Sequence, residues 1–111
     1  MPLRRAAALW PGLVFAVATL AFYWEIVLPG QILVDYDVWV YFYPLRSYAA
    51  DAIRAGRFPL WNPDIFLGAP FFANPQTAML YPGTALFYLL PVPYAFSLSI
   101  IGHVFLAIVS M

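Results

Sequence analysis

The sequence predicts an all-α integral membrane protein, in which two transmembrane helices are joined by a long extracytoplasmic loop with an amphipathic interfacial helix. Three observations predict this fold class. Of the 111 residues, 65% are hydrophobic and only 9% are charged, whereas soluble domains have about 25% charged residues. Long apolar runs lie at residues 6–28 and 94–111. The segment between them is rich in proline and aromatic residues, which suits the surface of a bilayer.

Residues 6–28 form the first predicted transmembrane helix. The run contains one charged residue, Glu25, and about 20 apolar residues are enough to cross the hydrocarbon core. Trp10 and Trp24 lie near its two ends, where aromatic side chains anchor a helix at the interface. The alternative is a cleaved signal peptide, but the run is longer than the roughly 7–15 apolar residues of a signal, and no small-residue cleavage site precedes Gly30. We therefore expect an uncleaved span.

The charges before this run predict the orientation. Arg4 and Arg5 place residues 1–5 in the cytoplasm by the positive-inside rule. Residues 29–93 are then the first extracytoplasmic loop, and in a bacterial host the membrane is the inner membrane. Residues 94–111 form the second predicted transmembrane helix, which is still apolar where the sequence stops. We expect the chain to be the N-terminal part of a larger multi-span protein or a truncated gene product.

The first part of the loop predicts a helix over residues 38–55. Apolar side chains such as Trp39 and Leu45 recur there at spacings of three and four residues, which makes one apolar stripe. Asp37 is placed to cap the N-terminus of the helix, and Gly56 is placed to end it. Such a helix is expected to lie along the membrane surface with its aromatic side toward the lipid.

Proline divides the rest of the loop. Pro44 marks either a bend in the first helix or its start. Residues 56–82 form a proline-rich aromatic loop, and residues 83–90, which are bracketed by Pro82 and Pro91, form a second short helix.

Asp35 and Asp37 are the first residues that suggest chemistry. One interpretation is that Asp37 caps the helix while Asp35 is simply solvated. The other is that both bind a cation or activate a nucleophile, because unpaired carboxylates are costly close to lipid. A divalent cation such as Mg²⁺ or Mn²⁺ is possible there, although two carboxylates alone supply too few ligands. The need for a metal stays open.

Composition also excludes partners. The chain has no lysine and a net charge of zero, so nothing in it is basic enough to follow a nucleic-acid backbone. The absence of cysteine excludes disulfides and thiolate metal sites.

A series of short motifs carries a resemblance to a known family. They are D-x6-P at residues 37–44, G-x-x-P-L-W-N-P at 56–63, G-x-P-F at 68–71, A-N-P-Q at 73–76, Y-P at 81–82, and His103 in the second span. In this order, after a first span, they resemble the N-terminus of YfhO-type bacterial membrane proteins, which belong to the GT-C superfamily of membrane glycosyltransferases. The resemblance covers about residues 7–111, and the block from PLWNP to YP is its most specific part.

The resemblance implies a function for the loop. Proteins of this class transfer a sugar from a polyprenyl-phosphate carrier to a cell-envelope acceptor, and their first extracytoplasmic loop carries the key aspartate. By position this is Asp37, with Asp35 as the second choice. Family members often have Gln-Tyr four and five residues later, where this chain has Tyr41 and Phe42. The remaining transmembrane helices of the parent protein are also implied as partners, so we expect this chain alone to be inactive.

The chemistry of sugar transfer assigns roles to other residues. A carboxylate can take the proton of the acceptor hydroxyl, and Arg46, Arg54 and Arg57 are candidates to bind the donor phosphate. Alternatively, these arginines extend from a surface helix to lipid headgroups.

Four more residues have both a structural and a functional interpretation. Trp61, Asn62 and Gln76 either shape the loop or contact the sugar or acceptor, and His103 is either a hydrogen-bonded interior residue or a functional group in the membrane. The alternative function is a non-catalytic transport or assembly subunit whose first loop is an interfacial plug, and a third is a bare membrane anchor.

Overall fold

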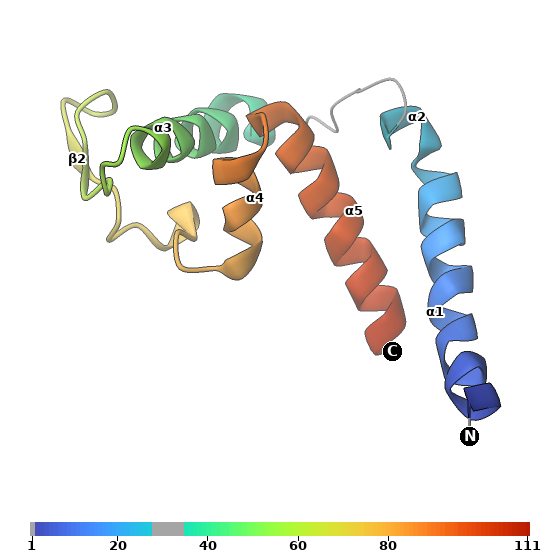
Figure 1. The fold of residues 1–111 in the computed structure, drawn as a ribbon. Helices are drawn as coiled ribbons and strands as arrows, with labels where there is room; N and C mark the ends of the chain where they lie inside the picture. The colour runs from blue at the N-terminus through green and yellow to red at the C-terminus, as the bar shows by residue number, and fades with distance from the viewer. Residues whose placement is uncertain (1, 28–34) are drawn as a thin grey trace. The chain divides into compact units, whose positions relative to one another are not determined.

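The computed structural model describes residues 2–27 and 35–111 and is mostly helical (Figure 1). The chain forms two compact units. The terminal unit consists of Met1–Leu33 together with Ser97–Met111, and the central unit consists of Val34–Phe96.

The N-terminal part of the terminal unit is α1, Pro2–Phe22, followed by the short α2, Trp24–Val27. Pro11 lies inside α1 without ending the helix. The predicted span at residues 6–28 therefore falls on helix, but the helix is interrupted at Tyr23 and residue 28 lies outside the described residues. The described apolar stretch, Leu9–Phe22, is shorter than a membrane span.

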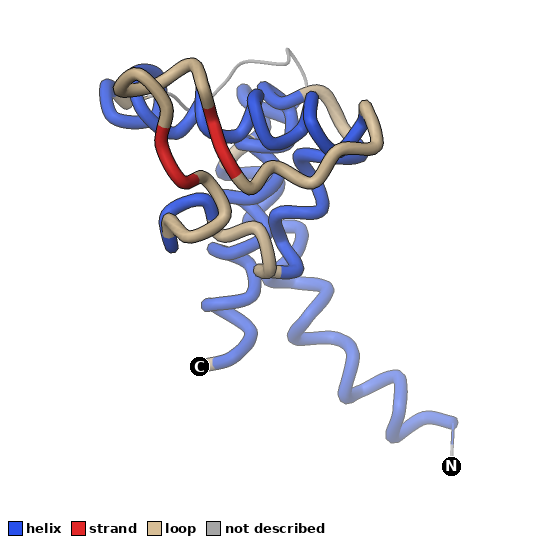
Figure 2. Tube along the Cα trace, turned by 90° about the vertical axis from the view of Figure 1, so that its left-hand side faces the viewer, coloured by secondary structure: helices blue, strands red, loops and turns tan. Residues whose placement is uncertain are grey.

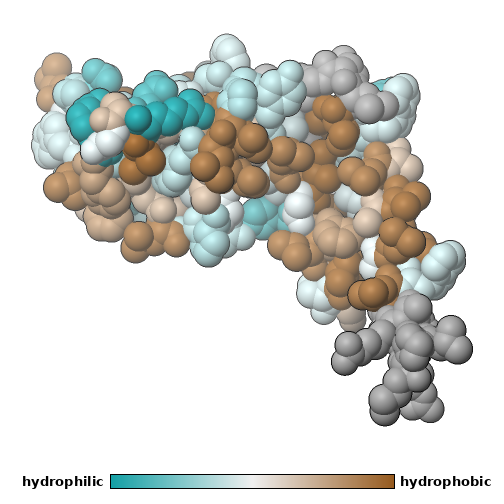
Figure 3. Space-filling view, viewed as in Figure 1, coloured by the Kyte–Doolittle hydropathy of each residue, from teal (hydrophilic) through white to brown (hydrophobic). Residues whose placement is uncertain are grey.

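One helix in the described part of the chain is long and apolar enough to cross a membrane. This is α5, Val92–Ser110, which covers residues 94–110 of the predicted second span and begins two residues before it. Its 19 residues, at about 1.5 Å each, extend for roughly 28 Å, close to the hydrocarbon thickness of a bilayer. Hydrophobic residues gather along it in Figure 3, and Leu98, Leu106 and Val109 are exposed on its surface.

The central unit begins with a wide helical turn. Residues of η1, Val38–Phe42, adopt a π-helix that runs directly into α3, Tyr43–Arg54. Pro44 lies in the first turn of α3. This agrees with the interpretation that Pro44 marks a helix start. In a regular helix its ring would clash with the carbonyl group four residues earlier. The wider turn of η1 comes just where this clash would arise.

The start of this helix differs from the sequence prediction. Asp37 does not cap it, because its backbone is already helical, with φ −64° and ψ −37°, and its side chain makes no capping hydrogen bond. Asp35 lies at the helix start instead: its carbonyl oxygen accepts from the Trp39 N–H at 3.0 Å. Its side-chain Oδ1 accepts from the Tyr36 N–H at 2.7 Å. The helix therefore starts one to two residues earlier than the capping prediction requires.

The end of α3 confirms the prediction for Gly56. This glycine has φ 71°, and its N–H donates to the Ile53 carbonyl at 2.9 Å. The Arg57 N–H donates to the Ala52 carbonyl at 2.9 Å. This pair of bonds is a Schellman motif, which satisfies carbonyl groups that a helix end would otherwise leave unpaired.

The aromatic segment after α3 folds into a small hairpin (Figure 2). Its strands, β1 at Trp61–Asn62 and β2 at Ala69–Pro70, pair antiparallel with Trp61 opposite Pro70. The 3₁₀ turns η2, Pro75–Thr77, and η3, Pro82–Thr84, follow, and then α4, Ala85–Leu89. The predicted short helix at residues 83–90 is thus a 3₁₀ turn that continues into α4.

The apolar stripe of α3 packs inside the central unit. Leu45 and Ala49 are buried together with Phe71 of the segment after β2. Around these three lie the partly buried side chains of Tyr41, Tyr48, Met79 and Tyr88. Burial of these side chains against other parts of the chain removes apolar area from solvent without any lipid. The sequence predicted that this stripe faces the membrane. In the structure Leu45 and Ala49 pack inside the central unit instead, while Trp39 stays exposed.

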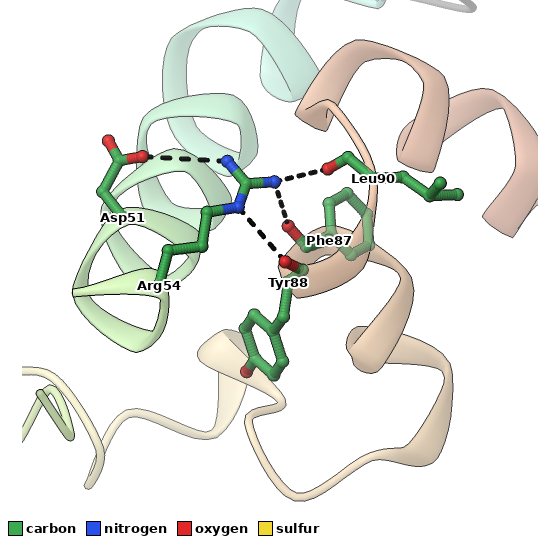
Figure 4. A network of polar contacts seen from close by, with 5 residues as sticks. All are labelled: Asp51, Arg54, Phe87, Tyr88 and Leu90. Atoms are coloured by element: carbon green, nitrogen blue, oxygen red, sulfur yellow. Dashed lines mark hydrogen bonds and ion pairs between the residues drawn. The ribbon is translucent and has the colours of Figure 1, made fainter. Parts of the chain in front are cut away.

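Arg54 joins α3 to the end of α4 (Figure 4). Its Nε donates to the Tyr88 carbonyl at 3.1 Å, and its Nη2 donates to the Phe87 carbonyl at 3.1 Å and the Leu90 carbonyl at 2.5 Å. Asp51, one turn earlier, is 3.9 Å from Nη1. The last carbonyl groups of a helix have no partners within it, and a cation placed there is favourable. Arg54 therefore acts as a cap on α4.

Candidate functional site

The central unit contains a groove of about 570 Å³ between the η1–α3 helix and the hairpin. This volume falls within the range of small-molecule sites, about 300–1,000 Å³. Val40, Tyr41, Pro44, Leu45, Tyr48 and Asp51 line it from the helix, and Asn62, Asp64, Ile65 and Phe66 line it from the hairpin. The groove thus combines apolar and aromatic side chains with two carboxylates and one amide.

Irregular backbone borders the groove on both sides. On the helix side, the π-helical η1 contributes Val40 and Tyr41. On the hairpin side, Phe66 and Leu67 are consecutive non-glycine residues in the left-handed region, with φ 50° and 61°. Each such residue costs roughly 1–2 kcal/mol. Such irregularities often occur at functional sites, and here both lie at the same groove.

The hairpin turn depends on Gly68. This residue has φ 108°, and a Cβ atom built there would lie 2.8 Å from the Trp61 ring. Its N–H donates to the Ile65 carbonyl at 2.7 Å. Trp61 therefore packs across the turn, although half of its surface remains exposed. This contact supports the structural interpretation of Trp61.

Asn62 and Tyr48 fix the hairpin to the helix. Asn62 is only 3% exposed, and its Oδ1 accepts from the Asp64 N–H at 2.9 Å. This bond is the turn that an Asn-Pro pair favours, and it holds Asp64 at the groove. The Tyr48 hydroxyl donates to the Trp61 carbonyl at 2.7 Å. The structural role predicted for Asn62 is therefore present, and the same residue also lines the groove.

Asp35 and Asp37 lie away from this groove. Both are exposed at the start of the helix, and neither is among the residues that line the groove. Within residues 2–27 and 35–111, no three histidine or acidic side chains gather closely enough to hold a metal ion. The catalytic roles of these two aspartates stay predictions.

Arg46 lies inside the central unit. One of its terminal nitrogens donates to the Thr77 carbonyl, and its guanidinium carbon lies 5.4 Å from the centroid of the Phe87 ring. Burial lowers the pKa of Arg46, and the nearby Tyr88 partly opposes that change. Burial also raises the pKa of Tyr88, whose hydroxyl is enclosed without a hydrogen-bond partner among the described residues. Arg46 is thus positioned as a packing and cross-linking residue.

The three arginines that we predicted to bind phosphate are not gathered at one place. Arg46 and Arg54 donate to backbone carbonyl groups of the central unit. Arg57 is exposed just beyond the end of α3. None of the three lines the groove.

Gln76 is tied to the groove through Tyr41. The Tyr41 hydroxyl donates to the Gln76 Oε1 at 2.5 Å and accepts from the Asn74 Nδ2 at 3.2 Å. Asn74 also caps η2, since its Oδ1 accepts from the Gln76 N–H at 3.0 Å. The Tyr41 hydroxyl thus joins the groove to Asn74 and Gln76.

His103 belongs to the terminal unit and is exposed on α5. Its Nδ1 lies 2.6 Å from the Ser99 carbonyl, one turn earlier in the same helix. A carbonyl oxygen can only accept, so Nδ1 is the donor in this contact. This contact agrees with the hydrogen-bonded interpretation of His103, but its exposed position does not agree with an interior residue.

The sequence prediction missed several residues of the groove. Tyr41, Tyr48 and Phe66 were not assigned to a site, and neither were Asp51 and Asp64, the two carboxylates that line it. The turn signal at Asn62-Pro63 was recognisable in the sequence. The two strands of the hairpin are only two residues long. The turn signal alone therefore did not reveal which hairpin side chains face the helix.

In its described part the chain is mostly helical, with one apolar helix of membrane-spanning length and a compact aromatic unit that carries a groove. Comparisons with protein-family models, with curated proteins and with solved structures found no match.

Proposed function

We propose that the chain is the N-terminal part of a membrane glycosyltransferase that takes a sugar from a polyprenyl-phosphate carrier and transfers it to a cell-envelope acceptor. The observation that supports this proposal is the folding of the family-like motifs into one unit. The PLWNP segment supplies β1 and the turn that holds Asp64, and the A-N-P-Q segment binds Tyr41 at the groove. A bare anchor or a simple linker does not need such a groove.

The proposed chemistry uses an exposed carboxylate and a sugar donor at the bilayer surface. Asp37, with Asp35 as the second choice, takes the proton of the acceptor hydroxyl as the sugar leaves its phosphate. Arg57 is the most available of the three arginines for the phosphate, because Arg46 and Arg54 already donate to carbonyl groups. In this proposal α5 and the first span anchor the unit in a bacterial inner membrane, with the N-terminus in the cytoplasm.

The test is an Asp37→Asn substitution in membranes that carry the protein from its intact gene. Transfer of radiolabelled sugar from the polyprenyl-phosphate donor to envelope material is expected to fall at least about 100-fold, as for loss of a general base. Glu25→Gln on α2 is the control, because it removes one carboxylate outside the proposed site. Normal transfer by Asp37→Asn, with the protein present in the membrane, would contradict the assignment.

A non-catalytic transport or assembly subunit is the second candidate. The placement of Asp35 and Asp37 outside the groove favours it, as does the exposed apolar tip of the hairpin, where Phe66 is 86% and Leu67 is 106% exposed. In that case the intact protein would transfer no sugar. Deletion of its gene would instead stop the transport or assembly of an envelope component.

A further inference from the structure

We propose that the groove of the central unit binds an organic ammonium group. This proposal does not depend on sugar transfer. It rests on the charge of the lining, on the aromatic rings and on a buried amide, all of which belong to the same groove.

The charged groups that line the groove are all acidic. Asp51 and Asp64 line it from opposite sides, one on α3 and the other in the hairpin turn. Among the described residues that line the groove, none is basic. The Arg54 Nη1 lies 3.9 Å from the Asp51 Oδ1. The other donors of Arg54 bind carbonyl groups at the end of α4. An anion in this groove would meet two like charges, of which only Asp51 has a cation near it among the described residues, whereas a cation would be attracted.

The aromatic rings of the groove suit a cation. Tyr41, Tyr48 and Phe66 line it, and an ammonium group is attracted to the face of an aromatic ring within about 6 Å of the centroid. The hydroxyl of Tyr41 is bonded to Gln76 and Asn74, and that of Tyr48 to the Trp61 carbonyl. These bonds fix the two rings before any ligand arrives. Phe66 is 86% exposed, so its ring has room to turn toward a ligand.

Asn62 adds a third point of recognition. Its Oδ1 accepts from the Asp64 N–H, and this bond identifies its Nδ2 as the remaining donor. Within the described part of the chain the Asn62 Oδ1 is bonded to the Asp64 N–H, and the Nδ2 is not enclosed away from solvent, so it stays available to a ligand in the groove. A ligand with a hydroxyl or ester oxygen near its ammonium group could accept a hydrogen bond from this Nδ2.

The chemistry therefore points to an amino alcohol. Two sources carry this chemistry at a membrane: the ethanolamine or choline headgroup of a lipid, and an amino sugar. Both present a cation next to an oxygen. Neutral sugars lack the charge, and a free phosphate, which has no ammonium group, carries the wrong sign for Asp51 and Asp64.

The decisive experiment compares choline with 3,3-dimethyl-1-butanol, which has the same shape but no charge. The full chain, labelled with ¹⁵N and solubilised in a maltoside detergent that lacks an ammonium group, is titrated with each compound while the Asn62 side-chain amide is followed by NMR. We expect choline to shift this signal and to bind at least about tenfold more tightly than the neutral compound. Equal binding of the two compounds would overturn the proposal, as would no binding of choline.

Two further titrations separate the sources of the ammonium group. Glucosamine is compared with methyl glucoside, and nanodiscs that contain phosphatidylethanolamine are compared with nanodiscs of phosphatidylglycerol. A shift with glucosamine but not with methyl glucoside assigns an amino sugar. A shift that appears only with phosphatidylethanolamine assigns a lipid headgroup. Equal binding of glucosamine and methyl glucoside would also overturn the proposal.

Variants connect the binding to the groove. Asp64→Asn is expected to weaken choline binding severalfold, and Phe66→Leu, which keeps an apolar side chain but removes the ring, is expected to do the same. Glu25→Gln on α2 removes the same charge outside the groove and is expected to leave binding unchanged. Unchanged binding in both groove variants, or equal loss in Glu25→Gln, would show that the cation does not bind here.

Discussion

At the scale of single residues, Arg54 is the cation that links two helices of the central unit. Three carbonyl groups around the end of α4 accept from its side chain (Figure 4). Without this cap, α4 would have only its packing contacts to keep it against α3. The pair between Arg54 and Asp51 is exposed and contributes little by comparison.

We predict that Arg54→Ala lowers the free energy of unfolding by about 1.5–3 kcal/mol, because hydrogen bonds to a charged donor are lost. Arg54→Lys, which keeps the charge but not the fork of donors, should recover part of this loss. Denaturation of the detergent-solubilised chain, followed by aromatic circular dichroism, measures the difference. Asp51→Ala is the matched control and should change stability by less than about 1 kcal/mol. An equal loss in both variants would argue against the capping role.

Tyr88 places a hydroxyl where no described group can bond to it. Burial raises the pKa of Tyr88, and the charge of Arg46 only partly offsets this. A raised pKa in the folded state means that the neutral tyrosine stabilises the fold below the ordinary pKa of about 10. This stabilisation is lost as the pH rises through the higher folded-state pKa.

We therefore predict that Tyr88→Phe keeps or raises stability at pH 7, because an unbonded buried hydroxyl is removed. Above about pH 10 the wild-type chain should lose stability more steeply than the variant. Stability measured against pH for both proteins tests this. Parallel curves, or a clear loss of stability in Tyr88→Phe at pH 7, would mean that the hydroxyl has a partner in solution.

At the scale of elements, the hairpin is the part of the fold that depends most on one glycine. Gly68 combines a positive φ with a close contact to the Trp61 ring, whereas Gly56 has a positive φ but open space around it. The two positions therefore separate backbone strain from steric overlap.

We predict that Gly68→Ala destabilises the chain more than Gly56→Ala does. The Gly56 variant should lose about 1–2 kcal/mol from backbone strain alone, and the Gly68 variant should lose more because the Trp61 ring has to move. Tryptophan fluorescence during denaturation reports both the stability and the environment of the ring. Equal losses in the two variants would contradict the close packing of Trp61 on the turn.

Elements with local signals were predictable from the sequence. The end of α3 at Gly56 followed from a glycine after an apolar stripe, and the Schellman bonds confirm it. The prediction that Asp37 caps the helix was wrong, because the helix that includes the π-helical η1 already contains that residue. The hairpin was missed because strands of two residues, one of them containing Pro70, show no alternating pattern.

The groove needed the structure, for a similar reason. Tyr41 and Asp64 lie in segments that meet only through tertiary packing, and no local spacing connects them. The sequence did identify Asn62 and Gln76 as residues of interest. Their contacts, with the Asp64 N–H and the Tyr41 hydroxyl, came from the fold.

At the scale of the whole molecule, the chain combines an apolar helix of membrane-spanning length with a folded unit that has its own core. Membrane association is supported by α5, which exposes large apolar side chains along its length. The segment that the sequence presented as an extracytoplasmic loop is a compact unit with a buried core and a groove of its own. Both functional proposals depend on that unit being folded.

The most direct test of this central claim is the contact between Leu45 of α3 and Phe71 beyond the hairpin, which are buried in one cluster. Nuclear Overhauser effects between the Leu45 methyl groups and the Phe71 ring can be measured in the full chain in detergent micelles. We predict a strong cross-peak, accompanied by slow exchange of the α3 amide protons. With both signals assigned, no cross-peak and fast amide exchange would show that residues 35–96 are a loose loop, and the groove would not exist.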